Sequence, residues 1–338
     1  MRAWAELLRV SALFSVPGDA LAGAAALGAR PNRGTALAVG ASLCLYGAGM
    51  ALNDWADRDE DAADRPHRPI PSGRISPPAA LAAAGALTAA GLALAARAGR
   101  PALRVGSALG ATVWSYDLHF KHTVAGPAAM SAARGLDLML GAVATGGVRP
   151  GGAASGGVVP GAGARGLRSD GAAGVGVVAA ALPSAVVLAA HTYAVTVVSR
   201  HEAQGGSTAA PLAALAATLG LGALASRTPR PVFAPRSVRA ELRGVPALPS
   251  PARGSAGLPL TPARLLAATY IRTAAKPLLH AALNPSPPLT QRAVGGGIRA
   301  MIPLQAALAA RTGAGATALA VMGLVPLARK LARKVSPT

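Results

Sequence analysis

Six of the thirteen acidic residues in the chain fall between residues 54 and 64, directly after an apolar run. The segment reads Asn53-Asp54-Trp55-Ala56-Asp57-Arg58-Asp59-Glu60-Asp61. If one helix continues through it, Asp57 and Asp61 lie within about 60° of Asp54 around the axis. The three carboxylates then share one face with Asn53 beside them, whereas Asp59 and Glu60 point elsewhere.

Three carboxylates on one face repel one another unless a cation lies among them. Hard oxygen ligands without histidine or thiolate suit Mg²⁺, which keeps several waters and accepts phosphate oxygens as further ligands. The pattern therefore predicts a magnesium site that receives a diphosphate group, with the ligands Asn53, Asp54, Asp57 and Asp61. The alternative is a solvated acidic loop whose charge is balanced by Arg58, Arg65, Arg68 and Arg74.

The elements that must position these residues are membrane helices. The chain has 338 residues, of which 52% are hydrophobic and 14% charged, whereas soluble domains have about 25% charged residues. Its apolar runs are long enough to cross a bilayer. We predict an all-α, polytopic membrane helix bundle in a single domain, 1–338, with about nine spans near 11–28, 35–53, 78–98, 102–118, 125–147, 172–198, 207–226, 293–311 and 313–331.

The net charge of +20 does not indicate nucleic-acid binding, because aromatic residues make up only 3% of the chain and the arginines lie between apolar runs. Basic loops beside membrane spans explain this pattern better. Membrane lipid is the expected partner, and the sequence implies no protein partner. The single cysteine, Cys44, excludes an internal disulfide and a cysteine-based zinc site.

Three segments do not fit the span pattern. We predict flexible loops near 148–171, which is rich in glycine, and near 227–258, which is rich in proline and arginine. Residues 259–283 are compatible with a helix but carry four basic side chains on one side, which favours a helix at the membrane interface. The alternative is a tenth span. The four side chains are those of Arg264, Arg272, Lys276 and His280.

The orientation in the cell membrane follows from basic residues. Arg58, Arg65, Arg68 and Arg74 place the loop after the second span, and the candidate site with it, in the cytoplasm. Nine spans would then leave the basic residues at 329–334 outside, against the positive-inside rule. A tenth span would remove this conflict, so the sequence leaves the number of spans open.

The pattern Asn53-Asp54-x-x-Asp57-x-x-x-Asp61 resembles the first aspartate-rich motif of the UbiA-type prenyltransferase superfamily. The proline-rich continuation at 65–76 is similar to the segment that follows this motif in the family. Tyr116 with Lys121 and His122 resembles its tyrosine and basic pair, and Gly296-Gly297-Ile298 the start of its eighth span. The resemblance covers most of the chain except the linkers and residues 227–292.

The resemblance implies a bundle of nine helices around a polar central cavity, in which Mg²⁺ and a prenyl diphosphate bind. It implies Mg²⁺-dependent transfer of a prenyl group from an isoprenoid diphosphate to a small acceptor, for example an aromatic one. Asp54, Asp57 and Asp61 would be the catalytic residues. The diphosphate would contact Asn53, Arg68, Tyr116, Lys121 and Arg200.

The chain departs from the family pattern at the second aspartate motif. Residues 199–206 stand at the expected place, and Glu202 is their only acidic residue. We expect Glu202 as a metal ligand and Arg200 as a diphosphate ligand, because a guanidinium matches phosphate oxygens. The alternative is a loop without catalytic function, in a UbiA-like protein that binds or moves a lipid-like metabolite without transferring a prenyl group.

Other polar residues lie within or beside the apolar runs. Asp137 near Arg134 is either a functional pair or a structural ion pair. His191 is expected in the core, although His191 and Tyr193 could line the cavity. Arg9 is expected at the membrane interface or at the cavity mouth. His119 belongs with the basic cluster after the fourth span, and the role of Asp19 is open.

Overall fold

The structure is a computed structural model that describes residues 2–147, 166–227 and 260–335. Every regular element in these ranges is a helix. The α-helices are α1 (Arg2–Leu7), α2 (Val16–Ala26), α3 (Arg33–Ala56), α4 (Arg58–Asp64), α5 (Pro77–Ala98), α6 (Arg100–Ser115), α7 (Gly126–Gly147), α8 (Gly166–Ser199), α9 (Ala209–Ala225), α10 (Pro262–Leu283), α11 (Pro287–Ala310) and α12 (Gly315–Val335). A 3-10 helix, η1 (Val10–Ser15), precedes α2, and a π-helix, η2 (Tyr116–Phe120), extends α6.

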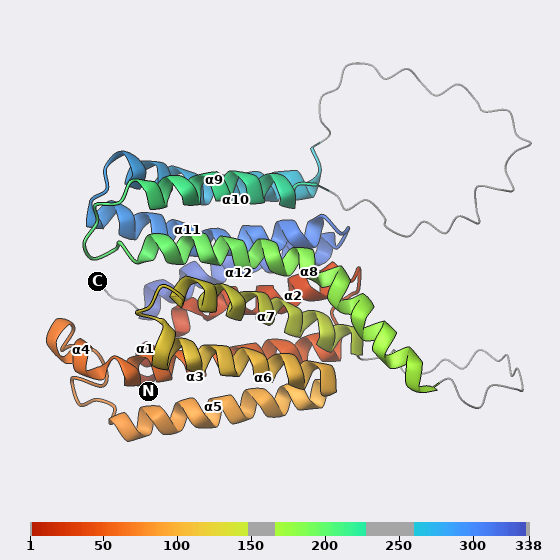
Figure 1. The fold of residues 1–338 in the computed structure, drawn as a ribbon, viewed down its shortest axis with the longest axis horizontal. Helices are drawn as coiled ribbons and strands as arrows, with labels where there is room; N and C mark the ends of the chain where they lie inside the picture. Colours follow the sequence, from red (N-terminus) through yellow and green to blue (C-terminus); the bar gives the residue numbers. More distant parts are fainter. Residues whose placement is uncertain (1, 148–165, 228–259, 336–338) are drawn as a thin grey trace, which may run out of the picture.

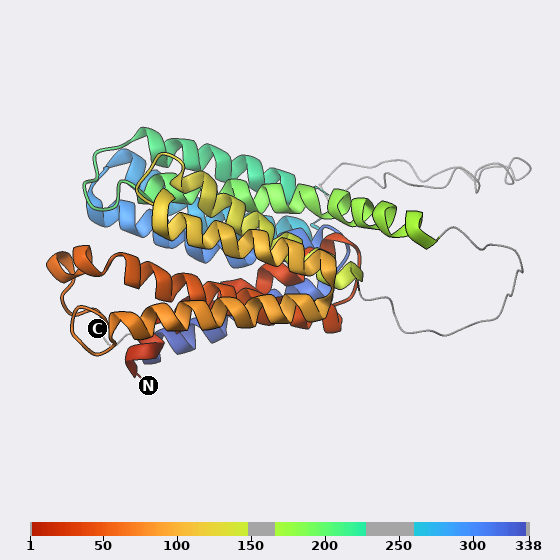
Figure 2. The ribbon, with the colours of Figure 1, turned by 60° about the horizontal axis from the view of Figure 1, so that its bottom comes forward.

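The long helices run side by side, up and down one bundle (Figures 1 and 2). Short α4 and the turns after η2 and after α8 lie together at one end of it. Four segments are long and apolar enough to cross a membrane within the described ranges, namely α3, α5, residues 174–199 of α8, and α11. The predicted all-helical bundle is confirmed, and each predicted span coincides with a helix to within a few residues.

Small residues let α2 and α7 touch through their backbones. A Cβ atom on Gly141 would lie 2.3 Å from the Cα of Ala20, and one on Gly23 would lie 2.2 Å from the carbonyl oxygen of Leu138. Glycine is therefore required at both positions for this approach. The crossing brings Asp19 of α2 next to the polar side chains of α7.

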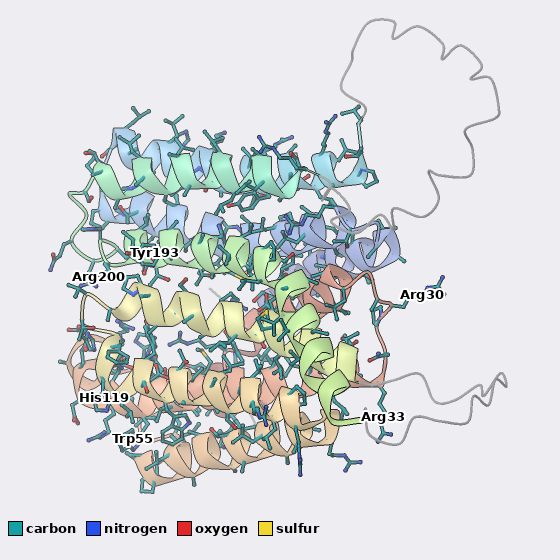
Figure 3. The ribbon with its side chains drawn as sticks, turned by 45° about the vertical axis from the view of Figure 1, so that its right-hand side comes forward. Arg30, Arg33, Trp55, His119, Tyr193 and Arg200 are labelled. Carbon is teal, nitrogen blue, oxygen red and sulfur yellow. The ribbon has the colours of Figure 1, made fainter. Side chains whose placement is uncertain are left out.

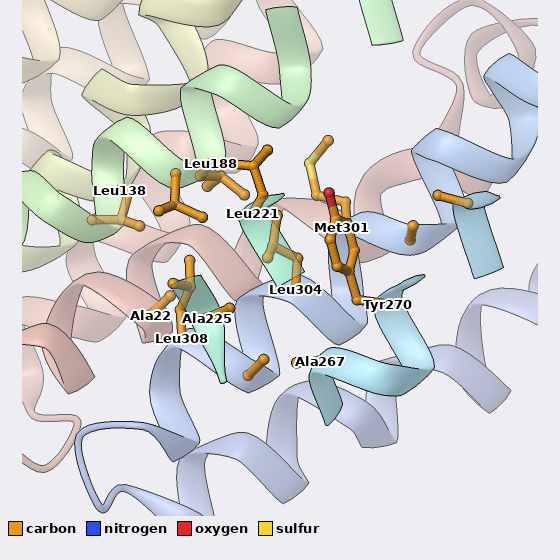
Figure 4. Packing of buried hydrophobic residues seen from close by; sticks show 14 of the residues in the cluster. Ala22, Leu138, Leu188, Leu221, Ala225, Ala267, Tyr270, Met301, Leu304 and Leu308 are labelled. Atoms are coloured by element: carbon orange, nitrogen blue, oxygen red, sulfur yellow. The ribbon is translucent and has the colours of Figure 1, made fainter. Parts of the chain in front are cut away.

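The largest buried cluster joins α7, α8, α9, α10 and α11 with Ala22 of α2, and includes Leu138, Leu188, Tyr270 and Leu304 (Figure 4). His191 belongs to it, because its Nε2 is 3.0 Å from the carbonyl oxygen of Gly297 and its Nδ1 is 3.0 Å from the Tyr270 hydroxyl. The expected core histidine is thus confirmed.

Tyr193, in contrast, is 47% exposed and is not among the residues that line the cavity described below. The suggestion that His191 and Tyr193 could line the cavity was therefore wrong. Residues that are two positions apart in a helix differ by about 200° around its axis, so these side chains lie on opposite sides of α8.

Helix α10 differs from the interfacial helix expected at 259–283. It runs the length of the bundle beside α9 and α11 (Figure 1). This arrangement is the one expected for the alternative named above, a tenth span. Ala263, Ala267, Tyr270, Ala274 and Leu278 form its buried stripe. Arg272, Lys276 and His280 lie on the exposed side. The apolar stripe therefore packs against α9 and α11, while the basic side chains remain on the opposite face. A position across the membrane stays a prediction for α10.

Because α10 belongs to the bundle, α12 ends at the same end as α4 (Figures 1 and 2). Residues 329–334 therefore lie on the side predicted to face the cytoplasm, and the conflict that nine spans created is absent. Of the two predicted flexible loops, residues 148–165 and 228–258 fall outside the described ranges. Residues 166–171, which the sequence placed in the first loop, begin α8.

Candidate active site

The acidic segment lies where α3 gives way to α4. Asp57 interrupts the helix with φ −89° and ψ 5°, yet its amide donates to Asn53 O at 3.0 Å and its carbonyl accepts from Asp61 N at 2.7 Å. The side chains of Asp54 and Asp61 are only 7% and 3% exposed. The alternative of a solvated acidic loop is wrong for these two carboxylates, since they are buried.

Arg68 holds Asp54 and Asp61 together. Its Nη1 donates to Asp54 Oδ1 at 3.3 Å and to Asp61 Oδ2 at 2.7 Å. The turn that carries Arg68 is anchored by the buried side chains of Ile70 and Ile75. One guanidinium thus neutralises part of the charge of two buried carboxylates, which explains how they lie near each other.

A second guanidinium reaches one of these carboxylates, Asp54, from the N-terminal segment. Arg9 Nη2 lies 3.2 Å from Asp54 Oδ1 and 3.3 Å from Asn53 Oδ1. Arg9 has φ 45°, the only left-handed non-glycine residue among those described, a conformation that costs about 1 kcal/mol or more. The contacts to Asp54 and Asn53 offset this strain. Arg9 therefore lies at the cavity mouth, one of its two expected positions.

Asp57 turns to a different cation. Lys121 Nζ, at the end of η2, forms an ion pair with Asp57 Oδ1, and His122 Nε2 lies 3.9 Å from the same oxygen. The next residue, Thr123, accepts a hydrogen bond from Arg200 Nη1 at 2.6 Å through its carbonyl oxygen. The structure thus brings together three predicted residues, Asp57, Lys121 and Arg200, from three separate connections of the bundle.

Figure 3 shows the same grouping at the level of the whole molecule. Arg200, His119 and Trp55 lie at the α4 end, whereas Arg30 and Arg33 lie at the opposite end.

A cavity of about 230 Å³ opens beside Asn53. At its mouth, Asn53 Nδ2 donates to Asp117 Oδ1 at 3.3 Å, and Arg9 and Tyr116 line the wall. Below the mouth the lining is apolar, formed by Leu45, Gly49, Met50, Leu109, Val113, Met130 and Ala133. The remaining lining residues are the polar Ser42, Tyr46, Arg134 and Asp137 at the far end.

Sequence reasoning missed Asp117. It lies inside the apolar run at 102–118, and an ionisable residue at such a place is a signal that could have found it. The roles of Arg134 and Asp19 also become clear, since Arg134 Nη1 donates to Asp19 Oδ2 at 2.5 Å. Arg134 thus forms its ion pair with Asp19 of α2 instead of the expected Asp137, whose carboxyl accepts a hydrogen bond from Ser42.

The donor groups fit a hard divalent cation. Within the described residues, oxygen or nitrogen atoms of Asp57, Glu60 and His122 lie within 4.8 Å of one another. The prediction that Glu60 points away from the site was wrong, because the break at Asp57 reorients the first turn of α4. His122 was likewise not predicted as a candidate ligand. The remaining ligand assignments, to Asn53, Asp54 and Asp61, stay predictions.

Glu202 lies in the turn after α8 and is not part of this group of possible ligands. Burial raises the pKa of its carboxyl above the ordinary value. A half-buried carboxyl with a raised pKa is suited to a cation that arrives with the substrate, but its role as a metal ligand stays a prediction.

Comparison with known proteins places these features in a family. A digeranylgeranylglyceryl phosphate synthase from Methanopyrus kandleri is 35% identical over 128 residues, which is 36% of this chain and 45% of that protein. A chloroplastic chlorophyll synthase from Arabidopsis thaliana is 48% identical over 52 residues, 15% of this chain and 13% of that protein. The chain thus spans less than half the length of these two relatives.

Two solved structures share the fold. A UbiA homologue from Aeropyrum pernix K1 aligns over 88% of this chain and 96% of its own, with a TM-score of 0.57 and 17% identity. One from Archaeoglobus fulgidus, bound to GPP and Mg²⁺, aligns over 95% of this chain and 99% of its own, with a TM-score of 0.52 and 17% identity.

Residues 12–231 match the sequence pattern of the UbiA prenyltransferase family. This range includes the buried carboxylates, Arg68, Lys121 and the residues that line the cavity apart from Arg9, and the resemblance noted in the sequence is confirmed. The chain is a polytopic α-helical membrane protein and belongs to the UbiA prenyltransferase family.

Proposed function

We propose that the protein transfers a prenyl group from an isoprenoid diphosphate to a small acceptor, with Mg²⁺ bound at the α3–α4 junction. One observation carries the proposal. Asp54, Asp57 and Asp61 are each paired with a cationic side chain, and Arg9, which also pairs with Asp54, lines a largely apolar cavity together with Asn53. The Mg²⁺ and prenyl diphosphate bound to the Archaeoglobus homologue support the same assignment.

Asp57 and Glu60 offer two hard oxygen ligands within 4.8 Å of each other, and Asp54 and Asp61 supply further carboxylates in the same segment. Bound there, Mg²⁺ would neutralise charge that develops on the departing diphosphate. Arg9, Arg68 and Lys121 already point at these carboxylates. Once the metal holds the carboxylates, these cations are in place to contact the phosphate oxygens and stabilise the leaving group.

Ionisation of the donor creates an allylic cation that must meet the acceptor before water does. The apolar wall formed by Met50, Leu109 and Val113 excludes water from the space next to Asn53. The acceptor attacks the cation at C1 and then loses a proton. Asp117 lines the cavity, bonded to Asn53, and is a carboxyl that could take that proton.

The same charges support the orientation in the cell membrane. The α4 end carries Arg58, Arg65, Arg68 and Arg74, and residues 329–334 lie at this end too. We propose that this end faces the cytoplasm, where a water-soluble diphosphate headgroup can enter.

The test is diphosphate release by the purified full chain in detergent, with Mg²⁺ and isoprenoid diphosphates of several chain lengths. We expect Asp54→Ala to abolish release while the protein stays folded. Asp59→Ala is the matched control, because the Asp59 side chain is 87% exposed and pairs only with Arg58. Full release by the Asp54→Ala variant would refute the proposal.

A second function has one observation in its favour. The turn at 199–206 supplies Glu202 alone where the family pattern has aspartates. A protein that binds a prenyl lipid without transferring the group would retain the cavity and lose that motif. Binding of a labelled prenyl diphosphate with no release across chain lengths and acceptors would favour this carrier.

A further inference from the structure

The far end of the cavity carries ionisable groups at a depth where an apolar tail would be expected to lie. Ser42 and Tyr46 reach it from α3, and Arg134 and Asp137 reach it from α7. Ser42 lies eleven residues before Asn53 on the same helix, which corresponds to about 16 Å along the axis. A ligand that fills the cavity therefore meets polar groups at both ends and an apolar wall between them.

We call this far end of the cavity, formed by Ser42, Tyr46, Arg134 and Asp137, the floor. The positive charge of Arg134 at the floor is already paired with a carboxylate. Arg134 Nη1 donates to Asp19 Oδ2 at 2.5 Å, and Asp19 Oδ1 accepts from Gln305 Nε2 at 2.6 Å. Asp19 is fully buried, so no solvent weakens its hold on the guanidinium. To a molecule in the cavity, Arg134 and Asp19 together present a neutral pair.

The second carboxyl of the floor, that of Asp137, forms no ion pair with a residue in the described ranges. Asp137 accepts a hydrogen bond from the Ser42 hydroxyl and lies against Asp19. Two carboxyl groups thus face one guanidinium. A carboxylate or phosphate on a ligand would add another negative group in a place of low dielectric constant, which is unfavourable. A hydroxyl or an amine would instead donate to an oxygen that is already present.

We propose that the floor binds the acceptor through a neutral hydroxyl or amine group and rejects acceptors that carry an anion there, and that Asp19 sets this selectivity by neutralising Arg134. The role assigned to the ligand rests on the proposed function. The charge of the floor does not depend on the proposed function, so an experiment can refute either one without the other.

Charge at the floor can be measured with a reporter thiol. Ala133 lines the cavity one turn before Asp137, and Ala133→Cys in a Cys44→Ser background gives one thiol next to the floor. The 2-hydroxyethyl, 2-aminoethyl and 2-sulfonatoethyl methanethiosulfonates are matched in size and differ in charge. Their labelling rates on the purified chain, divided by their rates on a free thiol, report which charge the cavity accepts.

We expect the anionic reagent to react at least about tenfold more slowly than the neutral one. Asp19→Asn keeps the shape of the side chain and one of its two acceptor oxygens but frees the charge of Arg134, and should raise the relative rate of the anionic reagent about tenfold or more. Asp59→Asn, outside the cavity, should leave the ratio unchanged.

An anionic rate equal to the neutral rate, or a thiol that no reagent labels, would overturn the proposal. A folded Asp19→Asn variant with an unchanged ratio would also overturn the role of Asp19. If that variant does not fold, the parent ratio decides, with Tyr46→Cys as a second reporter position.

Protection from the neutral reagent then tests the ligand class. We expect 4-hydroxybenzyl alcohol to slow labelling and 4-hydroxybenzoate, which differs by one charged group, to do so at least about tenfold less well. Protection by the carboxylate, or by neither compound, would overturn the assignment of the acceptor class. Absence of diphosphate release, measured separately, would instead refute the proposed function.

Discussion

Lys121 Nζ and Asp57 Oδ1 form an ion pair between residues that are 64 positions apart in the chain. The pair joins the end of η2 to the break between α3 and α4, and both side chains are largely buried. Lys121 thus occupies a carboxylate that the proposed function assigns to a metal. Binding of the metal must release the lysine, and the lysine then needs another anion.

This exchange predicts that Mg²⁺ and diphosphate bind cooperatively. Mg²⁺ alone would leave Lys121 and Arg68 without partners, whereas inorganic pyrophosphate supplies them. We expect each to raise the affinity of the other by about tenfold or more, measured by calorimetry on the full chain and corrected for the complex that the two form in solution. Lys121→Met should reduce the coupling. Independent binding of the two would contradict the exchange.

Removal of Arg68 should destabilise the fold. Arg68→Met leaves Asp54 and Asp61 buried without their shared guanidinium, and we expect a loss of about 2–4 kcal/mol in the free energy of unfolding. The double variant Arg68→Met with Asp61→Asn should recover part of it. Unfolding in mixed micelles, followed by tryptophan fluorescence, measures the change. Arg58→Met is the control, since Arg58 pairs with exposed Asp59 and lies over Trp55. Equal losses of unfolding free energy in Arg58→Met and Arg68→Met would rule out the special role of Arg68.

Arg9 should matter to turnover through its guanidinium. Arg9→Lys keeps a charge near Asp54, but its shorter side chain lacks the planar guanidinium that matches phosphate oxygens, so we expect kcat to fall by about tenfold. Arg9→Gly relieves the backbone strain at φ 45° and should therefore lose more turnover than stability. Normal kcat in Arg9→Gly would show that the strained residue serves the fold alone.

One surface pair should respond to pH. Glu6 accepts hydrogen bonds from Arg74 Nη1 and Nη2 at 2.7 and 3.1 Å, and the bond to Arg74 holds the pKa of Glu6 below its ordinary value of 4.5. A carboxyl with a lowered pKa in the folded state stabilises it above the ordinary pKa and loses this effect as pH falls through the folded pKa. Glu6→Gln should therefore lower Tm at pH 7 and leave it unchanged at about pH 3. A difference that persists at the lower pH would exclude this pair as its cause.

The contact between α2 and α7 should not accept a methyl group. In Gly141→Ala the new Cβ would lie 2.3 Å from the Cα of Ala20, and backbone cannot move aside as a side chain can. We expect a loss of about 1–3 kcal/mol in unfolding free energy. Gly85→Ala is the control, because no atom lies within 4 Å of a Cβ at Gly85. It should be neutral or slightly stabilising, and a similar loss in both variants would argue against the contact.

Much of this arrangement could be predicted from the sequence. Long apolar runs bounded by proline, glycine and arginine gave α3, α5 and α7 nearly at their observed ends. The acidic segment was found because carboxylates are rare elsewhere in the chain. What the pattern could not provide was the break at Asp57, whose side chain pairs with Lys121, and the approach of the exposed Glu60 to Asp57 and His122.

The partners of the cations and the composition of the cavity floor could not be predicted from the sequence, for a related reason. Arg9 and Asp54 are 45 residues apart, and no local pattern records which basic residue returns to which acid. In α8 the apolar residues surround the whole helix, so periodicity could not decide whether His191 or Tyr193 faces inward. For α10 the charges favoured the interface, because the sequence alone does not show that a neighbour covers the opposite stripe.

The distance between α2 and α7 is set by main chain, where Gly23 meets Leu138 and Gly141 meets Ala20. No exchange of larger side chains can change this distance by a small step. The width of the cavity is set instead by side chains such as Met50, Leu109 and Met130, which can be replaced one at a time. Evolution of this chain, or an engineer, could therefore retune the girth of an accepted molecule gradually, whereas the placement of Asp19 beside Arg134 would change only if α2 and α7 were reset as whole helices.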